Sequence, residues 1–448
     1  MTGRWPIPAS WQWARAATLA EVVGGGTPRT TDPDHFTGSP DGAIAWLTPA
    51  DLSGHAAMLV HHGARYLTPR GHRASAARLL PAGSVVFSSR APIGRCAIAG
   101  APLCTSQGFR SFVLRTPEVA SEYLYLYLLA SRDHAHSLAS GSTFKELSGT
   151  RAGQMWVPVA PAAEQRRIVA KVQAVRARCA RAGALLAAAP GQLATLRQAI
   201  LGAALRGQAS AAWRGQDGAS QDIDGLPGTW RRVALGEVAR VQPGFAFKSA
   251  WYRDAGVRLL RGSNVAPQRV RWDDVVFLDP AIARGYAAYM LSAGDIVIAM
   301  DRPLVADGLK VGRIATADLP CLLVQRVARL IPGDAISSDY LALALQGRQF
   351  CAHLGARATG TALPHVSADD IASAPLAVPP LAEQQVIVDA MRVRLEHLAA
   401  ATRLHARLRG ALADVEQAAL ARAFRGELVA QDPEDEPAAA ILARLVAP

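Results

Sequence analysis

The chain repeats itself once, and this repeat constrains its fold more than any other feature. Ala163-Glu164-Gln165 recurs as Ala382-Glu383-Gln384, 219 residues later, and Ser121-x-Tyr123-Leu124 recurs as Ser338-x-Tyr340-Leu341, 217 residues later. Pro8-x-x-Trp11 also recurs, as Pro227-x-x-Trp230 at an offset of 219. A period of this length is that of a duplicated domain and not of a solenoid unit. We therefore expect two similar domains in the 448 residues.

The offset between the copies changes along the chain. It is 211 at Leu80-x-Ala82-Gly83, which recurs from Leu291, and 218 at Gly94-Arg95, which we match with Gly312-Arg313. This alignment predicts a seven-residue insertion in the second copy, in the loop from Asp301 to Val311. Loops tolerate changes in length and carry recognition.

The first 150 or so residues of each copy predict a mixed α/β domain. Runs of Val, Ile and Phe at 84–87 and 295–298 are typical of strands. Residues 121–131 predict a short helix whose apolar face packs in the core. Gly24-Gly25-Gly26 predicts a loop. This loop could be a turn that approaches phosphate. A flexible connection is at least as consistent with the sequence, because the P-loop pattern is absent.

The last part of each copy predicts a long helix. From residue 162 to about 206, and from 382 to about 426, Leu, Ile and Val recur at spacings of three and four. Pro190-Gly191 predicts a break or kink in the first helix. Each helix would reach roughly 65 Å. The two apolar stripes are expected to pack against each other as an antiparallel coiled coil.

The expected organisation has six segments. These are a first α/β recognition domain (1–160), a first spacer helix region (161–206), a loose polar linker (207–226), a second recognition domain (227–380), a second spacer helix (381–429) and a C-terminal tail (430–448) with a short apolar helix at 438–445.

Composition excludes several classes of protein. Basic residues outnumber acidic ones by 48 to 36, which gives a net charge of +12. This excess favours a polyanionic partner such as nucleic acid. A genome rich in GC codons is an alternative explanation for the many arginines. No apolar run approaches the roughly 18 residues of a membrane helix, and the first residues do not resemble a secretory signal. Five cysteines without a C-x-x-C pair favour a reducing cytoplasm.

The sequence contains no pattern typical of catalysis. The methyltransferase, zinc-protease and nucleophile-elbow motifs are absent, and His61-His62 is the one close histidine pair. We therefore expect a non-catalytic binding protein with no metal site and no cofactor.

Several strings resemble the DNA-specificity (S) subunits of type I restriction-modification systems, and together they cover nearly the whole chain in family order. They are Gly24 to Pro28, Thr48 to Leu52, Leu80 to Gly94, Gly141 to Lys145, Pro161-x-x-Glu164-Gln165, Pro380-x-x-Glu383-Gln384, Ala423 to Leu428 and Gln431 to Ala438.

The resemblance implies a subunit without enzymatic activity. Two target-recognition domains would each read one half of a bipartite site in double-stranded DNA, with the paired helices as the ruler between them. The helices would also dock methyltransferase subunits, two in number, and endonuclease or translocase subunits would join. The residues Glu164, Gln165, Glu383 and Gln384 at the helix starts are the candidates for subunit docking.

Candidate DNA contacts are basic residues in loops, because Arg and Lys suit both guanine and phosphate. In the first domain they are Arg29, Arg90, Arg95 and Lys145, and in the second Lys248, Arg302, Lys310 and Arg313. The second copy departs from the first in two ways: Asn264 replaces Asp51, and Met300-Asp301-Arg302-Pro303 replaces the Ser-Ser-Arg-Ala-Pro string.

Two alternatives remain open from the sequence. The chain could be a coiled-coil scaffold whose two domains bind protein, or an enzyme with an unrecognised site. Binding to DNA that weakens with salt would argue against the scaffold, since neutralising phosphates releases counterions.

Overall fold

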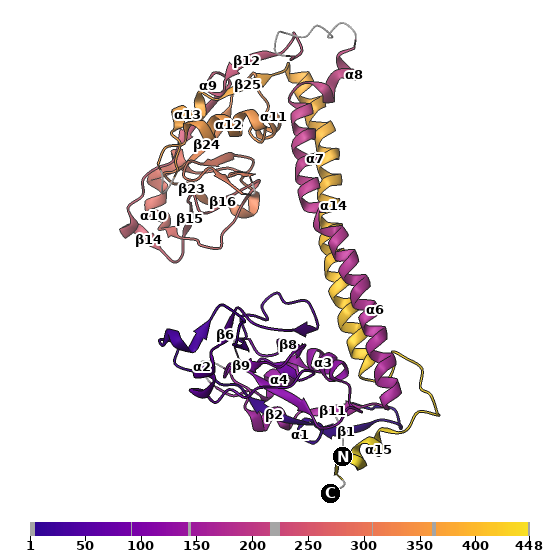
Figure 1. The fold of residues 1–448 in the computed structure, drawn as a ribbon. Helices are drawn as coiled ribbons and strands as arrows, with labels where there is room; N and C mark the ends of the chain where they lie inside the picture. Colours follow the sequence, from indigo (N-terminus) through magenta and orange to yellow (C-terminus); the bar gives the residue numbers. More distant parts are fainter. Residues whose placement is uncertain are drawn as a thin grey trace. The chain divides into compact units, whose positions relative to one another are not determined.

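The two copies fold into domains of matching topology. A computed structural model of the chain describes residues 5–90, 92–141, 145–215, 225–306, 308–360 and 364–446. Its contacts divide into unit 1 (residues 1–187 and 407–448) and unit 2 (residues 188–406) (Figure 1). The fold class expected from the repeat, two mixed α/β domains each followed by a long helix, is confirmed.

Unit 1 contains two main sheets and one strand pair. The larger sheet has the order β2-β10-β7-β8-β5, the second sheet has the order β3-β6-β4-β9, and β1 pairs with β11. The strands are β1 (Gln12–Arg15), β2 (Ala20–Gly24), β3 (Phe36–Thr37), β4 (Ile44–Leu47), β5 (Leu59–Val60), β6 (Arg65–Leu67), β7 (Val85–Phe87), β8 (Cys96–Ala99), β9 (Cys104–Thr105), β10 (Arg110–Leu114) and β11 (Trp156–Val159).

The helices of unit 1 are α1 (Ala16–Leu19), α2 (Pro69–Arg73), α3 (Ser121–Ala130), α4 (Arg132–Leu138), α5 (Gly149–Gly153), α6 (Ala162–Ala187), α15 (Ala438–Val446) and the last part of α14 (Leu381–Ala423). Of these, α1, α3 and α5 pack against the larger sheet, and α6 is the first long helix. The predicted apolar face of α3 is confirmed, since Tyr123, Leu124, Tyr127 and Leu128 are fully buried. The predicted C-terminal helix is also present, as α15.

Unit 2 repeats this arrangement. Its sheets have the orders β13-β24-β19-β22 and β14-β18-β15-β23, and β12 pairs with β25. The strands are β12 (Arg231–Ala234), β13 (Ala239–Pro243), β14 (Tyr252–Arg253), β15 (Val257–Leu260), β16 (Val265–Ala266), β17 (Arg269–Val270), β18 (Phe277–Leu278), β19 (Ile296–Ala299), β20 (Leu304–Val305), β21 (Gly308–Leu309), β22 (Val311–Arg313), β23 (Cys321–Leu323), β24 (Val327–Pro332) and β25 (Pro375–Val378). The helices are α7 (Ala189–Ala204), α8 (Ala211–Arg214), α9 (Leu235–Val238), α10 (Pro280–Ala283), α11 (Ser338–Ala344), α12 (Arg348–Arg357), α13 (Ala368–Ala372) and the first part of α14.

The long helices pack side by side within each unit. In unit 1, Ile168 and Val172 of α6 belong to the same buried cluster as Leu420 of α14, and the Nε atom of Arg176 lies 2.7 Å from a carboxylate oxygen of Glu416. In unit 2, α7 and the start of α14 share a second cluster. The first long helix is interrupted as Pro190-Gly191 predicts, since α6 ends at Ala187 and α7 begins at Ala189.

The strand register corrects one match between the copies. In unit 1, Phe87 pairs with Cys96 and Val85 with Ile98, whereas in unit 2 Ile298 pairs with Val311 and Ile296 with Arg313. Cys96 therefore corresponds to Val311. It follows that Arg95 corresponds to Lys310 and not to Arg313, and that the loop before β22 is longer by four residues, not seven. The sequence match at Gly-Arg was wrong because a dipeptide does not fix a register.

Close backbone packing argues against the glycine loop as a flexible connection, whereas its approach to phosphate stays a prediction. A Cβ atom at Gly25 would lie 1.9 Å from the carbonyl oxygen of Ser106, and one at Gly244, the equivalent residue, would lie 2.3 Å from that of Val324. Both positions require glycine because two backbone segments approach closely there.

The predicted loose linker is ordered at its start. Gly207 adopts a positive φ of 81° and ends the helical run, after which η2 (Gln208–Ser210) and α8 follow. Ser210 and Arg214 both hydrogen-bond to the buried carboxylate of Glu383, which fixes this stretch against the start of α14. Residues 216–224 of the predicted linker lie outside the described residues.

Candidate nucleic-acid interface

Basic side chains gather at one end of the larger sheet of unit 1. Arg90 follows β7, Arg95 precedes β8 and Arg110 begins β10, so the three meet at the same end of these antiparallel strands. Glu146 lies 3.0 Å from Arg110 and 3.9 Å from Arg90, and the exposed Lys145 is its neighbour in the chain. Two of these arginines thus lie beside a single carboxylate. Arg110 is a member that the sequence did not indicate.

Arg95 differs from the others because its guanidinium is used within the domain. It donates to the carbonyl of Pro49 at 2.7 Å and to the hydroxyl of Ser53 at 3.2 Å, and so fastens the loop after β4. In that loop Asp51 accepts the N–H of Thr48 at 2.7 Å. In unit 2 Asn264 accepts the N–H of Arg261 in the same way, so the exchange of Asp for Asn keeps the turn.

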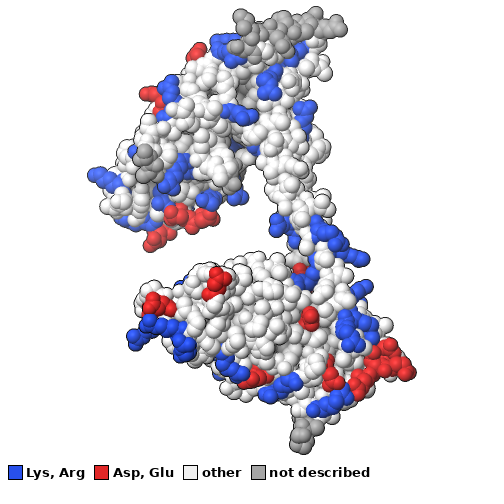
Figure 2. Space-filling model, in the orientation of Figure 1, with Lys and Arg blue, Asp and Glu red and all other residues white. Residues whose placement is uncertain are grey.

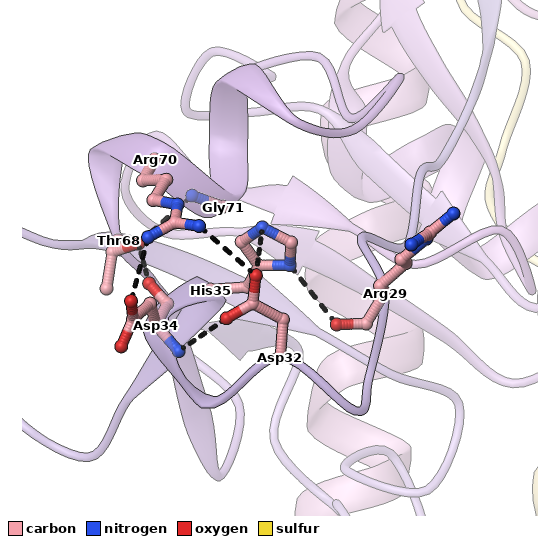
Figure 3. A network of polar contacts seen from close by, with 7 residues as sticks. All are labelled: Arg29, Asp32, Asp34, His35, Thr68, Arg70 and Gly71. Atoms are coloured by element: carbon pink, nitrogen blue, oxygen red, sulfur yellow. Dashed lines mark hydrogen bonds and ion pairs between the residues drawn. The ribbon is translucent and has the colours of Figure 1, made fainter.

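The loop that carries Arg29 is held by a network of polar contacts (Figure 3). The buried His35 lies 3.3 Å from a carboxylate oxygen of Asp32, and its Nδ1 lies 3.2 Å from the carbonyl oxygen of Arg29. Arg70 bridges Asp32 and Asp34 at 3.4 and 2.8 Å. The side chain of Arg29 points away from this network and is exposed. The backbone is therefore fixed while the guanidinium is presented to solvent.

Unit 2 gathers cations at the corresponding end of its β13-β24-β19-β22 sheet. Lys310 precedes β22 and donates to the carbonyl of Asp301 at 3.3 Å, while Arg326 precedes β24 and lies 3.8 Å from the Asp301 carboxylate. Burial lowers the pKa of the Lys310 ammonium; the Asp301 charge opposes this, and the charges of Arg271 and Arg302 lower the pKa further. Arg271 and Arg326 are members that the sequence did not indicate.

Two candidates of unit 2 lie elsewhere. Arg313 pairs with Asp339 at 2.6 Å and with the carbonyl of Ser338 at 2.9 Å, at the opposite end of β22 from Lys310. The exposed Lys248 lies with its ammonium 5.6 Å from the ring centre of Trp251, in the loop before β14. The structure therefore brings Arg302 and Lys310 together and leaves Arg313 and Lys248 outside their cluster. A role of these two residues in DNA binding stays a prediction.

Cations also follow α6. Arg166, Lys171, Arg178 and Arg181 are exposed, and Figure 2 shows blue side chains along this helix and on the visible face of each unit. Arg167 and Arg176 are instead paired with Asp435 and Glu416 inside unit 1. Part of the positive charge of α6 is thus paired with acids of the same chain.

Comparison with known proteins gives the family. The family model described as "Type I restriction modification DNA specificity domain" matches residues 9–181 and again residues 227–406. The chain belongs to this family. The duplication seen in the sequence is therefore a duplication of the specificity domain.

Two relatives and one solved structure illustrate the similarity. The chain is 36% identical to the type I restriction enzyme EcoAI specificity subunit of Escherichia coli, over 37% of this chain and 28% of that protein. It is 35% identical to the MjaIX specificity subunit of Methanocaldococcus jannaschii, over 36% of this chain and 37% of that protein. The matched part is thus well under half of each relative. A structure from a study of complex assembly in a type I R-M system aligns with a TM-score of 0.71 at 21% identity, over 95% of this chain and 100% of that one, which shows a shared fold.

The Glu-Gln pair at the start of each specificity domain's long helix is buried. Gln165 accepts the N–H of Ala120 at 3.0 Å and donates to the carbonyls of Glu118 and Ala160 at 3.3 and 2.9 Å. Gln384 makes the same three bonds, with Ser337, Ala335 and Pro379. A glutamine amide supplies one acceptor and two donors and so satisfies three backbone groups.

The two glutamates are buried as well. Glu164 accepts from the indole of Trp11 at 2.8 Å and from Gln431 at 2.5 Å, and Glu383 accepts from Ser210 and Arg214. The two glutamines and Glu164 join the long helices to their own specificity domains, whereas Glu383 binds Ser210 and Arg214, which lie after α7. The role of the four glutamate and glutamine side chains in docking other subunits stays a prediction, and the geometry assigns them a structural one.

Among the described residues, no three His, Cys, Asp or Glu side chains group as metal ligands would. In the same ranges no helix is long and apolar enough to cross a bilayer.

Proposed function

We propose that this chain is the DNA-recognition subunit of a type I restriction-modification complex in the cytoplasm. Each specificity domain reads one half of a bipartite target in double-stranded DNA, and the helices pair along their length as a coiled coil that sets the gap. Methyltransferase subunits and endonuclease or translocase subunits dock on the chain and carry out methylation and cleavage, so that the chain itself needs no catalytic site.

One observation carries this proposal. Two domains of matching sheet order each gather loop cations at the same end of one sheet, the sheet that contains β7 in unit 1 and β19 in unit 2. Phosphate and base edges attract Arg and Lys. The cations differ between the domains in position and surroundings. This is what two domains that read different half-sites require.

The test is a map of methylated adenine in cells that express the chain with its cognate methyltransferase subunit, beside cells that lack only this chain. We expect a bipartite motif with a fixed gap that is present only when the chain is made. Full methylation of the same motif without the chain would overturn the proposal. A failure of the two proteins to co-purify, with no motif, would favour the protein-binding scaffold.

A further inference from the structure

The loop that is longer in unit 2 forms a small hairpin. β20 pairs antiparallel with β21, with Leu304 opposite Leu309 and Val305 opposite Gly308. Backbone hydrogen bonds close its base, from Lys310 to the carbonyl of Pro303 and from Arg302 to that of Pro364. In the described part of residues 88–95, the equivalent loop of unit 1, there is no strand pair. The hairpin is thus a feature of one specificity domain alone.

The hairpin exposes aliphatic side chains. Leu304 is 37% and Val305 41% exposed, whereas Leu309 is buried. A hollow beside Leu304 is lined by Arg302, Pro303, Gly355, Ala358 and Pro364. Leu304 reaches the glycine of α12, since a Cβ atom at Gly355 would lie 3.3 Å from a Leu304 methyl. Two aliphatic side chains of the hairpin are therefore exposed, and one of them borders a hollow.

Cations lie near these exposed side chains. Four cations lie around Asp301, namely Arg302, Lys310, Arg271 and Arg326, and Asp273 lies beside Arg271. The hairpin turn also carries Asp307, which lies outside the described residues. Arg302 and Arg326 have φ angles of 43° and 69°, a region that is costly for residues other than glycine and that is found mostly at functional loops. The exposed side chains of Leu304 and Val305, with cations around them, match a duplex groove, where phosphates flank the base edges.

Within a groove, one base feature is aliphatic. Thymine presents its C5-methyl group in the major groove, and proteins read it by apolar contact. We propose that Leu304 and Val305 contact a thymine methyl group in one half-site and so require an A·T pair there, while the surrounding cations hold the adjacent phosphates. This inference rests on the proposed function and names the base feature that unit 2 recognises.

The experiment removes only the methyl group. Duplexes carry the motif found by methylation mapping, and each required thymine is replaced singly by deoxyuridine, which pairs alike but lacks the methyl. Binding by the full chain with its methyltransferase subunits is measured at fixed salt. The wild-type chain should lose affinity about fourfold at one position, the value of one buried methyl-sized group.

Variants of the chain test whether the hairpin causes this loss of affinity. The double variant L304A/V305A should bind the thymine and uracil duplexes equally at that position. The matched control is L79A, which truncates a similarly exposed leucine of unit 1 (52% exposed) and should keep the fourfold difference.

Two outcomes would overturn the inference. Equal binding of all duplexes by the wild-type chain does so, and this result does not depend on whether a variant folds. A double variant that binds DNA normally but no longer co-purifies with the methyltransferase subunit would make the hairpin a protein contact. Absence of any sequence-specific binding is the separate result that rejects the proposed function itself.

Discussion

At the scale of single residues, the equivalent glutamines explain why the same triplet stands at both helix starts. Each is buried, and each satisfies three backbone groups at the junction of domain and helix. A buried backbone group that loses its partner costs about 1–3 kcal/mol. The motif is therefore a structural joint between the domain and its helix.

We expect Gln384→Ala to lower the free energy of unfolding of unit 2 by about 3 kcal/mol, since it leaves several buried groups unpaired. Its neighbour Gln385 is exposed, and Gln385→Ala should change stability by less than about 0.5 kcal/mol. Hydrogen exchange of peptides from unit 2 measures both. Equal protection in the two variants would contradict the role of Gln384.

A pH effect is expected at the equivalent glutamate of unit 1. Burial raises the pKa of the Glu164 carboxyl above its usual value, against the hydrogen bonds from Trp11 and Gln431. The folded chain therefore binds this proton at a higher pH than the unfolded chain does. Protonation of Glu164 thus increases the free energy of unfolding as the pH falls through the folded-state pKa toward the usual value of 4.5.

The variant Glu164→Gln cannot titrate and lacks this gain. The stability of the wild type relative to the variant should thus increase between about pH 7 and about pH 4.5. Urea unfolding at both pH values checks the sign. A relative stability that falls over this interval would show that the pKa is lowered instead.

At the scale of elements, each long helical run ends against the proline that starts a domain. A Cβ atom at Gly426 would lie 2.2 Å from Pro8, and one at Gly207 would lie 2.6 Å from Pro227. Both glycines have positive φ angles, 75° and 81°. The repeat thus includes the helix ends, a similarity that the sequence comparison left out.

In unit 1 the end of α14 is fixed by Phe424. Its ring lies 5.2 and 5.1 Å from the rings of Tyr123 and Tyr127, and it is fully buried. Phe424→Ala should therefore destabilise unit 1 by about 3–5 kcal/mol. Hydrogen exchange should show the loss in residues 5–187 and not in residues 225–360. A loss confined to the second range would contradict this.

At the scale of the whole molecule, each specificity domain has its own cation cluster. We therefore expect a substitution in one cluster to weaken binding to one half-site only. Arg302→Ala should cost about 1–3 kcal/mol on duplexes that carry one half-site and leave the other unaffected. Arg313→Ala is the matched comparison, because its guanidinium pairs with Asp339 at the other end of the sheet. An equal loss in this variant would support the predicted DNA contact of Arg313. Equilibrium binding to duplexes with one half-site scrambled measures both.

The salt dependence of the same variants distinguishes the kind of contact. If Arg302 lies on a phosphate, its removal weakens binding to unrelated DNA equally and reduces the slope of log affinity against log salt by about one. If it reads a base, the loss is confined to the specific duplex. Binding that is insensitive to salt would contradict a DNA interface altogether.

The sequence by itself determined the duplication, the α/β class, the helix of residues 121–130, the break at Pro190-Gly191 and the C-terminal helix. Each follows from local signals: a repeated string, an apolar period or a proline that removes a backbone donor. The tertiary structure decided what depends on register and burial. It showed that Lys310 and not Arg313 matches Arg95, that Arg110 and Arg326 join the clusters, and that Glu164 and Gln384 face inward. A sequence does not show which residues of distant strands lie opposite each other, because pairing is set by the packing of the whole sheet.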